Sequence, residues 1–447
     1  MRGDFSRLTP DPADYSLVLL QQGRVLVESD WNTAMATLIG AQRTMAADLI
    51  GPHGGPKKNL GFVPHQISNG RTDLEFKAGV YYVDGIRVEL PPELDKVRWS
   101  AQPYPIAATP PQLPKPPYVV YLDVWERHVS TLEDDRIREV ALGGPDTTSR
   151  RQIIWQLRVA EYSGDKPQCG EFPLAEWRAG LRGNPPMLRA RTGPPPTDDD
   201  PCLASPDARY RGVENQLYRV EIASVADEAV KDSVTSFVWS RENGSVAAAW
   251  TGTIGNRLHV AGIKDVKRGF AAGDWVELTW DTLEYAGIAG TRVKLTGVDG
   301  NLLIFDLNSK TGEIETDPAS RPHAKVRRWD QRERKAAPLV HGAVEVVEAI
   351  GDNGWIPLEN GIEIQFLTAD PVGAHTYRVG DYWTIPARVV TGDIIWPRAA
   401  DGVTASFVPP HGVEHHYAPL AFVGSGEGGD EDLQHVFDQA AHCPDAT

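Results

Sequence analysis

The stretch that decides the fold class is VYYVDGIRVEL, residues 80–90. Apolar and polar residues alternate in its second half, which is the period of a strand that has one face against a core. The central Asp84-Gly85 pair is typical of a type I′ turn, since both central residues of that turn take positive φ. The stretch therefore predicts a tight β-hairpin.

The same chemistry recurs along the chain. Asn243-Gly244 and Asp299-Gly300 each predict a further hairpin between apolar segments. The flanking strands are predicted at 237–239 and 246–247, and at 293–295 and 302–305. Other strands are predicted at 118–125 and 153–160, and residues 275–280 are typical of a small barrel. With 42 glycines and 35 prolines the chain turns often. We therefore predict a mainly β fold with a long N-terminal helix (α+β), built from several β-sandwich or small-barrel domains.

The predicted helix covers residues 31–50. Asp30 is placed to cap its first turn, and Gly51-Pro52 ends it, because glycine accepts a left-handed cap and proline cannot continue a helix. Its apolar residues recur at helical spacing. They are Trp31, Ala34, Met35, Leu38, Met45 and Leu49. Two interpretations stay open, a helix that faces the core of its own chain and a helix that packs against a symmetry mate.

Changes in composition divide the chain into five predicted segments. Seven prolines fall within residues 103–117 and six within 183–201, which predicts extended straps or linkers. The segments are the N-terminal signature and helix (1–60), a β domain with proline-rich straps (61–200), a β domain with the barrel-like stretch (201–335), a C-terminal β region (336–423) and a flexible acidic tail (424–447).

Charge and hydropathy exclude several classes of protein. The formal net charge of −16 argues against nucleic-acid binding, because phosphate contacts need a basic surface. No basic and apolar leader is visible, and the apolar runs are too short to span a bilayer. Cys169, Cys202 and Cys443 are too widely spaced for a zinc-binding pair, so a reducing compartment is expected. A Cys169–Cys202 disulfide formed after cell lysis is the alternative. We expect synthesis in the cytoplasm, with no membrane insertion.

One motif is formally that of a metal-dependent hydrolase. His411, Glu414 and His415 match the inverted zinc-protease pattern H-x-x-E-H, and His416 follows. That chemistry needs a helix to hold both histidines on one side of the metal. Pro409-Pro410 and Pro419 disfavour a helix here. We predict no cofactor and no catalytic residues, and we name His411, His415 and His416 as candidate ligands of a structural or adventitious metal ion.

The 13 tryptophans raise an alternative function. In a β-rich protein most tryptophans belong to the core, while exposed ones suit stacking on sugars or protein interfaces. A carbohydrate-binding or cell-surface-binding module is therefore the alternative to an assembly role, and a metal-dependent hydrolase built on the histidines ranks below both.

A resemblance follows from nine sequence blocks. They are GDFSR (3–7), QQGRV (21–25), DWN (30–32), YLDVWERHV (121–129), ALGGPDT (141–147), YRGVENQLYRV (210–220), WSRENGS (239–245), GDYWTIPAR (380–388) and HHYAPLA (415–421). The chain resembles an uncharacterised bacterial family whose members are often encoded beside phage-tail-like contractile injection particles and their baseplate genes. The hairpin at 80–90 also looks like elements of phage tail-fibre and baseplate proteins.

The resemblance implies that the chain is a structural subunit of such a particle. It would be associated with the baseplate or belong to a fibre or shell. The assembled particle would be either released from the cell or retained in it. Its partners would be other particle proteins and copies of itself, in a trimer or larger ring. The polar residues of the N-terminal blocks are the candidate contact residues. For two of them a local role is the alternative, Asp30 as a helix cap and Arg24 as the partner of a nearby carboxylate. They are Asp4, Arg7, Gln21, Gln22, Arg24, Asp30 and Asn32.

Overall fold

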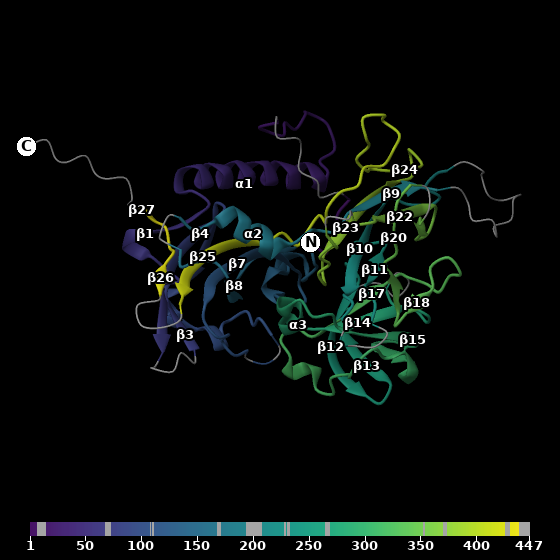
Figure 1. Cartoon of the computed structure of the whole chain (residues 1–447). Coiled ribbons are helices and arrows are strands. Elements are labelled where there is room, and N and C mark those ends of the chain that lie inside the picture. The colour runs from purple at the N-terminus through teal and green to yellow at the C-terminus, as the bar shows by residue number, and fades with distance from the viewer. Residues whose placement is uncertain are drawn as a thin grey trace, which may run out of the picture. The chain divides into compact units, whose positions relative to one another are not determined.

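The computed structural model describes most of the chain, and its described residues form a mainly β protein, as predicted (Figure 1). The described residues are 1–6, 15–67, 73–107, 109, 111–167, 171–193, 208–227, 229, 233–263, 269–351, 354–369, 373–424 and 430–437. Arg7, the three cysteines and the run of acidic residues at 198–200 lie outside them. No helix in the described part has the length and hydropathy that crossing a bilayer requires.

The chain divides into two compact units that alternate along the sequence. Unit 1 comprises residues 1–7, 128–151 and 182–413, and unit 2 comprises residues 8–127, 152–181 and 414–447. These units cut across the five consecutive segments suggested by composition. Strand pairing between distant segments, rather than proximity in the sequence, decides which residues share a core.

Unit 2 holds the N-terminal helix and three sheets. The helices are α1 (Glu28–Ile50) and α2 (Leu174–Arg182). The first sheet has the order β27 (Val436–Phe437), β1 (His53–Pro56), β4 (Gly79–Val83), β5 (Ile86–Leu90), and the second has β2 (Pro64–Ile67), β3 (Asp73–Lys77), β6 (Lys96–Arg98). The third has β26 (Glu431–Asp432), β25 (His416–Val423), β7 (Tyr118–Val129), β8 (Arg150–Glu161).

The hairpin that opened the sequence argument is confirmed. Strands β4 and β5 pair with Val83 opposite Ile86, and both turn residues take positive φ, 46° at Asp84 and 76° at Gly85. Alternate side chains of the hairpin, including Tyr81 and Val88, are buried in the main core of the unit. The strands predicted at 118–125 and 153–160 are the cores of β7 and β8.

Unit 1 contains a six-stranded sheet, a closed barrel, a smaller sheet and helix α3 (Asp281–Ala286). The six-stranded sheet has the order β18 (Leu339–Val340), β19 (Ala343–Glu345), β11 (Ser236–Ser240), β10 (Gln216–Ser224), β23 (Tyr382–Arg388), β24 (Asp393–Ile394). The barrel has the order β12 (Ala247–Ile254), β13 (Arg257–Ala261), β16 (Leu302–Phe305), β15 (Thr291–Asp299), β14 (Trp275–Thr279), β17 (Lys325–Trp329). In the smaller sheet β22 (Ile362–Leu367) pairs with β20 (Glu348–Ala349), β21 (Ile356–Pro357) and β9 (Leu188–Thr192).

The barrel confirms two local predictions and corrects a third. The strand predicted at 275–280 is β14 of the closed barrel, and the hairpin predicted at Asp299-Gly300 is β15–β16. The hairpin predicted at Asn243-Gly244 is wrong. Both residues take positive φ, as the turn chemistry required, but β11 belongs to the six-stranded sheet and β12 to the barrel. The turn therefore carries the chain from one sheet to another.

Two predictions about irregular segments also need correction. The strap predicted over 183–201 contains β9, which pairs with β22 along five residues. The tail predicted to be flexible from residue 424 contains β26 and β27 within residues 430–437, because their backbones complete the edges of β25 and β1. In the segment predicted as a strap at 103–117, Ile106 and Leu113 pack against buried residues of the core of unit 2.

Candidate functional site

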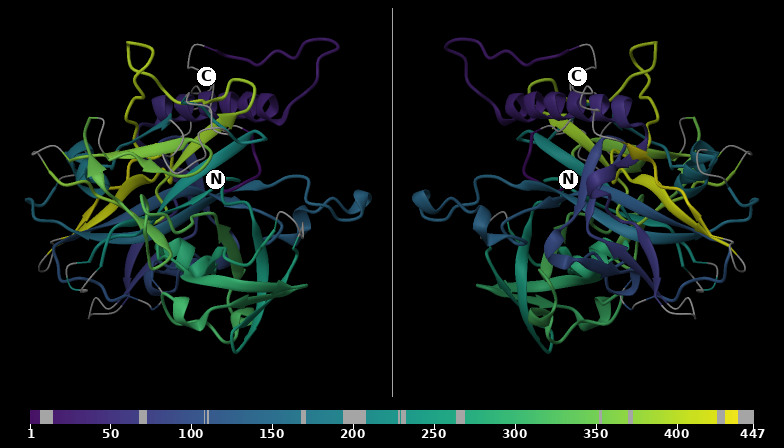
Figure 2. Two further views of the ribbon diagram at one scale, coloured as in Figure 1. Left: turned by 90° about the vertical axis from the view of Figure 1, so that its right-hand side faces the viewer. Right: turned by 90° about the vertical axis from the view of Figure 1, so that its left-hand side faces the viewer.

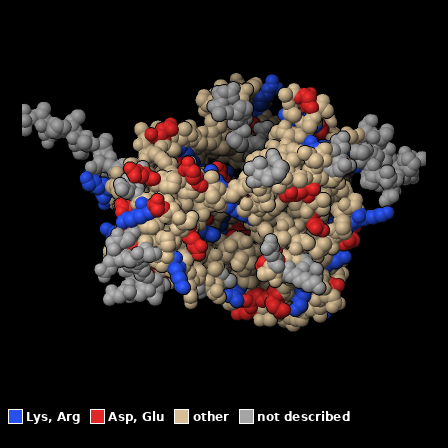
Figure 3. Space-filling view, viewed as in Figure 1, with Lys and Arg blue, Asp and Glu red and all other residues tan. Residues whose placement is uncertain are grey.

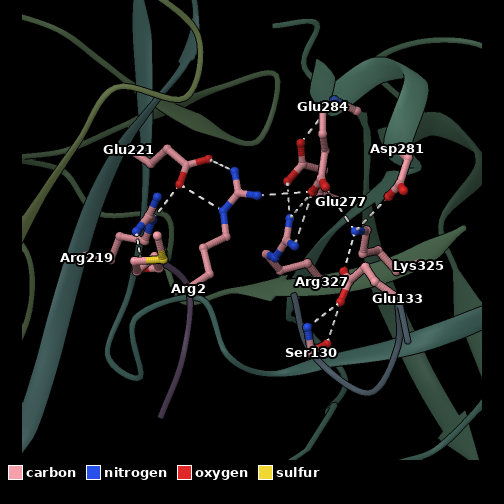
Figure 4. Close-up of polar contacts among 12 residues, drawn as sticks. Arg2, Ser130, Glu133, Arg219, Glu221, Glu277, Asp281, Glu284, Lys325 and Arg327 are labelled. Atoms are coloured by element: carbon pink, nitrogen blue, oxygen red, sulfur yellow. Dashed lines mark hydrogen bonds and ion pairs between the residues drawn. The ribbon is translucent and has the colours of Figure 1, made fainter. Parts of the chain in front are cut away.

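The first candidate site is a cluster of charged side chains inside unit 1, shown in Figure 4. We call it the charge cluster, and its members come from the N-terminal segment, the loop after β7, strands β10, β14 and β17, and helix α3. They are Arg2, Glu133, Arg219, Glu221, Glu277, Asp281, Glu284, Lys325 and Arg327. Charges that leave water need partners, and these residues supply partners to one another.

Lys325 occupies the barrel side of the charge cluster. Its side chain is only 1% exposed, and its Nζ lies 2.6 Å from Glu133 Oε1 and 2.9 Å from Glu284 Oε2. Glu133 also accepts hydrogen bonds from the backbone amide and the hydroxyl of Ser130, at 2.8 and 2.7 Å. Arg327, two residues further along β17, reaches Glu284 at 3.3 Å. Strand β17 therefore points two cations at carboxylates from α3 and from the loop after β7.

Arg2 joins the other side of the charge cluster to the N-terminal segment. Its guanidinium bridges Glu221 of β10 and Glu284 of α3, with Nη1 3.0 Å from Glu284 Oε1. Arg219 pairs with the same Glu221, donates to the Met1 carbonyl at 2.9 Å and lies 3.6 Å from the centre of the Tyr382 ring. The N-terminal segment is thus held by two ion pairs at its second residue.

Side chains of other segments hold the next residues of the N-terminal segment, by hydrogen bonds to backbone carbonyls and by one ring contact. Asn243 donates to the Gly3 carbonyl at 3.0 Å, and Arg388 donates to the Ser6 carbonyl at 2.8 Å. Phe5 packs edge-on against His128. Five of the nine sequence blocks therefore meet at this site through contacts within unit 1. They are GDFSR, YLDVWERHV, YRGVENQLYRV, WSRENGS and GDYWTIPAR.

The pKa values of the carboxyl groups follow from this pairing. Burial alone would raise the pKa of Glu133, but Lys325 and the hydrogen bonds outweigh burial and lower it to about 2. In the same way Arg2 and Arg219 outweigh burial and lower the pKa of Glu221 to about 2. The pKa of Glu284 also lies well below its usual range, against the effect of burial, because Lys325, Arg327 and Arg2 surround it. These carboxylates stay charged at neutral pH.

A group that donates or accepts protons in catalysis needs a pKa near the working pH and a free path to its substrate. Glu133, Glu221 and Glu284 do not meet the first condition, because the cations around them hold their pKa values well below neutral pH. The arrangement fits a structural clamp that joins the N-terminal segment, α3 and β17.

The clamp predicts a specific sensitivity to acid. The folded-state pKa values of Glu133 and Glu221 lie near 2, below their ordinary value of 4.5. Their contribution to stability is therefore complete above the ordinary value and is lost as the pH falls toward 2. We expect hydrogen-exchange protection in β17 to fall between about pH 5 and pH 2. Constant protection over that range would contradict the clamp, and Glu221→Gln should weaken the dependence on pH.

The three histidines named as candidate metal ligands have separate partners. His411 accepts a hydrogen bond at Nδ1 from the Thr384 amide, at 3.0 Å, and burial lowers its pKa. In unit 2, His415 Nδ1 lies 2.7 Å from Asp123 Oδ1 and His416 Nδ1 lies 2.9 Å from Asp84 Oδ2. The H-x-x-E-H segment is not helical. Within the described residues no three groups of metal-ligand type converge.

All 13 tryptophans lie in the described part of the chain, and only Trp31 is exposed. Nine are buried, and Trp177, Trp280 and Trp355 are half-buried. Arg189 and Arg191 stack on the half-buried Trp355, at 4.9 and 3.9 Å from the ring centre. The aromatic residues that prompted a sugar-binding interpretation are thus mostly core residues.

The second candidate site is the outer surface of residues 15–50 in unit 2, which we call the N-terminal strip. Helix α1 is longer than predicted, since it begins at Glu28. Asp30 therefore lies inside the first turn, where its charge favours the helix N-terminus, and the prediction that it caps the helix is wrong. Val27 stands at the cap position without a side-chain hydrogen bond.

Most of the large apolar side chains of α1 are exposed rather than packed against the rest of unit 2. Trp31 is 62% exposed, Leu38 63% and Leu49 80%, and Thr33 is the one buried residue of the helix. The interpretation of α1 as a core-facing helix is therefore wrong. Its inner side is fixed by polar contacts, with Arg43 bound to Glu126 at 2.8 and 3.0 Å.

The segment before α1 is exposed as well. It loops away from α1 (Figure 2), and its apolar residues Leu17, Leu19, Leu20, Val25 and Leu26 are all more than half exposed. Gln21 to Arg24 form a turn, closed by the Arg24 amide on the Gln21 carbonyl at 3.3 Å, with Gly23 at φ 73°. Exposed large apolar side chains in this number are typical of a site of interaction.

The candidate contact residues separate into two groups. Gln21, Gln22 and Arg24 are exposed on the N-terminal strip, and Asp30 and Asn32 are half-buried at the start of α1. Asp4 is exposed in unit 1, beside residues held by the charge cluster. Sequence reasoning missed the charge cluster itself. A signal was present in β17, where Lys325, Arg327 and Arg328 interrupt a strand that is buried along its whole length.

The surface that Figure 3 shows carries acidic and basic side chains interspersed, without a continuous basic tract on that face. The described part of the chain is β-rich and combines a closed barrel and a buried charge cluster in unit 1 with an exposed apolar strip in unit 2. The chain matches the Family of unknown function (DUF6519) over residues 1–169 and 177–432, and it belongs to that family. This agrees with the resemblance to an uncharacterised family. Neither a curated protein nor a solved structure matches the chain.

Proposed function

We propose that the chain is a structural subunit of a phage-tail-like contractile injection particle, acting through protein–protein contacts as a baseplate-associated, fibre or shell component. The observation that carries the proposal is the N-terminal strip, because it presents large apolar side chains to solvent on a helix fixed to a β scaffold. Such a surface is costly in water unless a partner covers it. The particle itself is proposed from the nine sequence blocks and the family resemblance that they carry.

The features of the charge cluster favour this role over catalysis. The buried ion pairs tie the N-terminal segment to α3 and to the barrel strand β17, so the blocks that carry the resemblance build a rigid interior. In unit 2, Asp84 of the hairpin turn binds both His416 and Arg178, at 2.9 Å each. In both sets the charged groups pair with other groups of the same unit, which suits a scaffold whose binding surface lies elsewhere.

The proposal predicts that the chain co-purifies with contractile particles. Particles would be purified by sedimentation from a bacterium that encodes the chain, and mass spectrometry would be used to find it among their proteins. We expect it in the particle fraction in a fixed ratio to the sheath protein, and we expect it to be lost from that fraction after the double substitution Trp31→Glu and Leu38→Glu. Thr44→Glu, at an exposed polar position of the same helix, is the matched control and should leave the ratio unchanged.

Two outcomes would count against the proposed function. The chain could be absent from intact particles, or its deletion could leave particle yield and appearance in electron micrographs unchanged. A third outcome, retention of the double variant, would keep the particle assignment and move the contact surface away from the N-terminal strip.

A further inference from the structure

The exposed side of α1 has the spacing of a coiled-coil seam. Six of its exposed residues follow one another at intervals of four, three, four, three and four. They are Trp31, Met35, Leu38, Gln42, Met45 and Leu49. All six are exposed. Intervals of this kind place side chains on a stripe that another helix can cover along its whole length. An ordinary surface helix turns such a stripe toward its own core.

The other sides of α1 are consistent with this assignment. On the side opposite the seam Thr33 is buried, and Ala36 and Ala47 are half-buried, whereas Gly40 is exposed. The positions that flank the seam are small or uncharged, apart from Asp48. They are Asn32, Ala34, Ile39, Ala41, Ala46 and Asp48. A second copy of the same helix would therefore meet almost no like charge at the flanks, where charged residues normally select coiled-coil partners.

We propose that α1 associates with α1 of other copies of this chain, as a parallel and in-register coiled coil. This inference rests on the proposed function and names the partner of its N-terminal strip as a second copy. The heptad stripe is the reason for choosing a copy, because the seam of one α1 is covered by an identical seam at the same spacing.

Gln42 decides the direction of the helices. In an antiparallel pair centred on α1, Trp31 would face Leu49, and Gln42 would face Leu38. Its amide would then be buried against an apolar side chain without a hydrogen-bond partner, which is costly. In a parallel, in-register bundle each Gln42 faces its equivalent, and the amides can bond to one another. A single polar residue in a seam fixes register in this way.

The seam is also large enough to form a specific interface between two helices. From Trp31 to Leu49 it extends about 27 Å at 1.5 Å per residue. Five large apolar side chains that each bury about 100 Å² give roughly 1,000 Å² for a pair of helices, which reaches the lower range of specific interfaces. The exposed segment of residues 15–27 can add to this area.

The first experiment measures mass by light scattering across a range of protein concentrations. The wild-type chain is expected to form a dimer, trimer or higher ring, and Leu38→Glu with Met45→Glu is expected to weaken association by about 30-fold or more. Because both side chains are exposed in the single chain, the variant should keep its circular dichroism and thermal transition. Thr44→Glu, off the seam on the same helix, should associate like the wild type.

The second experiment measures direction. Spin labels are placed at Glu28 in a chain whose Cys169, Cys202 and Cys443 are replaced by serine, and distances between labels on different copies are measured. A parallel, in-register bundle places these labels within about 20 Å of each other, whereas the antiparallel pair separates them by more than about 30 Å along the helix axis. A long distance would overturn the parallel arrangement.

The outcomes separate this inference from the proposed function. An oligomer that survives charging of the seam overturns the coiled coil, while the chain can still belong to the particle through another surface. A monomer at every concentration also overturns it, and the presence of that monomer in purified particles would keep the assembly role with a different protein as partner. A chain that is monomeric and also absent from particles would contradict both the coiled coil and the proposed function.

Discussion

Lys325→Met is expected to destabilise the barrel of unit 1 by about 3–5 kcal/mol, because it leaves a buried carboxylate without its cation. Glu133 loses more of its stabilisation than Glu284 does. It keeps only the Ser130 hydrogen bonds, whereas Glu284 retains Arg2 and Arg327. The loss of stability should be measured as reduced hydrogen-exchange protection in β14 and β17, because a chain of two units does not give a single unfolding free energy.

Two further variants show whether charge or packing is responsible. Adding Glu133→Gln to Lys325→Met removes the unpaired charge and should restore most of the protection, since replacing both partners of a buried pair costs far less than replacing one. Lys310→Met is the surface comparison, because Lys310 pairs with the exposed Glu313 at 3.5 Å, and it should change stability by about 0.5 kcal/mol or less. If the double variant were no more stable than Lys325→Met, the ion pair would not be the cause.

Gly85→Ala is expected to destabilise the attachment of α1 by about 3 kcal/mol or more. Gly85 takes φ 76° in the hairpin turn, a conformation that costs other residues about 1–3 kcal/mol. A methyl group there would also lie 2.1 Å from the Arg43 carbonyl oxygen of α1, so the helix would have to move. Hydrogen exchange should therefore accelerate along α1 as well as in β4 and β5.

Gly300→Ala gives the matched comparison for Gly85→Ala. Gly300 also takes positive φ in a hairpin turn, at 57°, but a methyl group there meets nothing within 4 Å. It should show the backbone cost alone, confined to β15 and β16. Equal effects of the two substitutions, with α1 exchange unchanged, would mean that the close approach of the helix does not matter for its attachment.

The parts of the fold that could be predicted from sequence are those that local chemistry decides. Asp84-Gly85 specifies its own turn, and alternation along β5 specifies which side chains face the core. Asn243-Gly244 shows the limit of that reasoning. The turn formed as its chemistry requires, but the partners of β11 and β12 were decided by distant strands.

The charge cluster could not be predicted because its partners are remote in the chain. Arg2 and Glu221 are 219 residues apart, and Lys325 and Glu133 are 192 apart. The apolar stripe of α1 was visible in the sequence, yet spacing alone does not reveal what a stripe faces. The structure supplies that direction, since Trp31 and Leu38 lie on the side away from unit 2.

The alternation of the two units along the chain has a consequence for biosynthesis. Strand β7 cannot acquire its neighbour β25 until translation has passed residue 423, and Asp123 meets His415 across 292 residues. Contacts of such long range form slowly, because the intervening chain loses entropy before it gains contacts. Neither unit is one continuous stretch of sequence, so neither can finish folding on the ribosome before later segments are synthesised. A nascent chain would stay unfinished until near the end of synthesis, its strand edges open, and fragments cut at the unit boundaries should be insoluble.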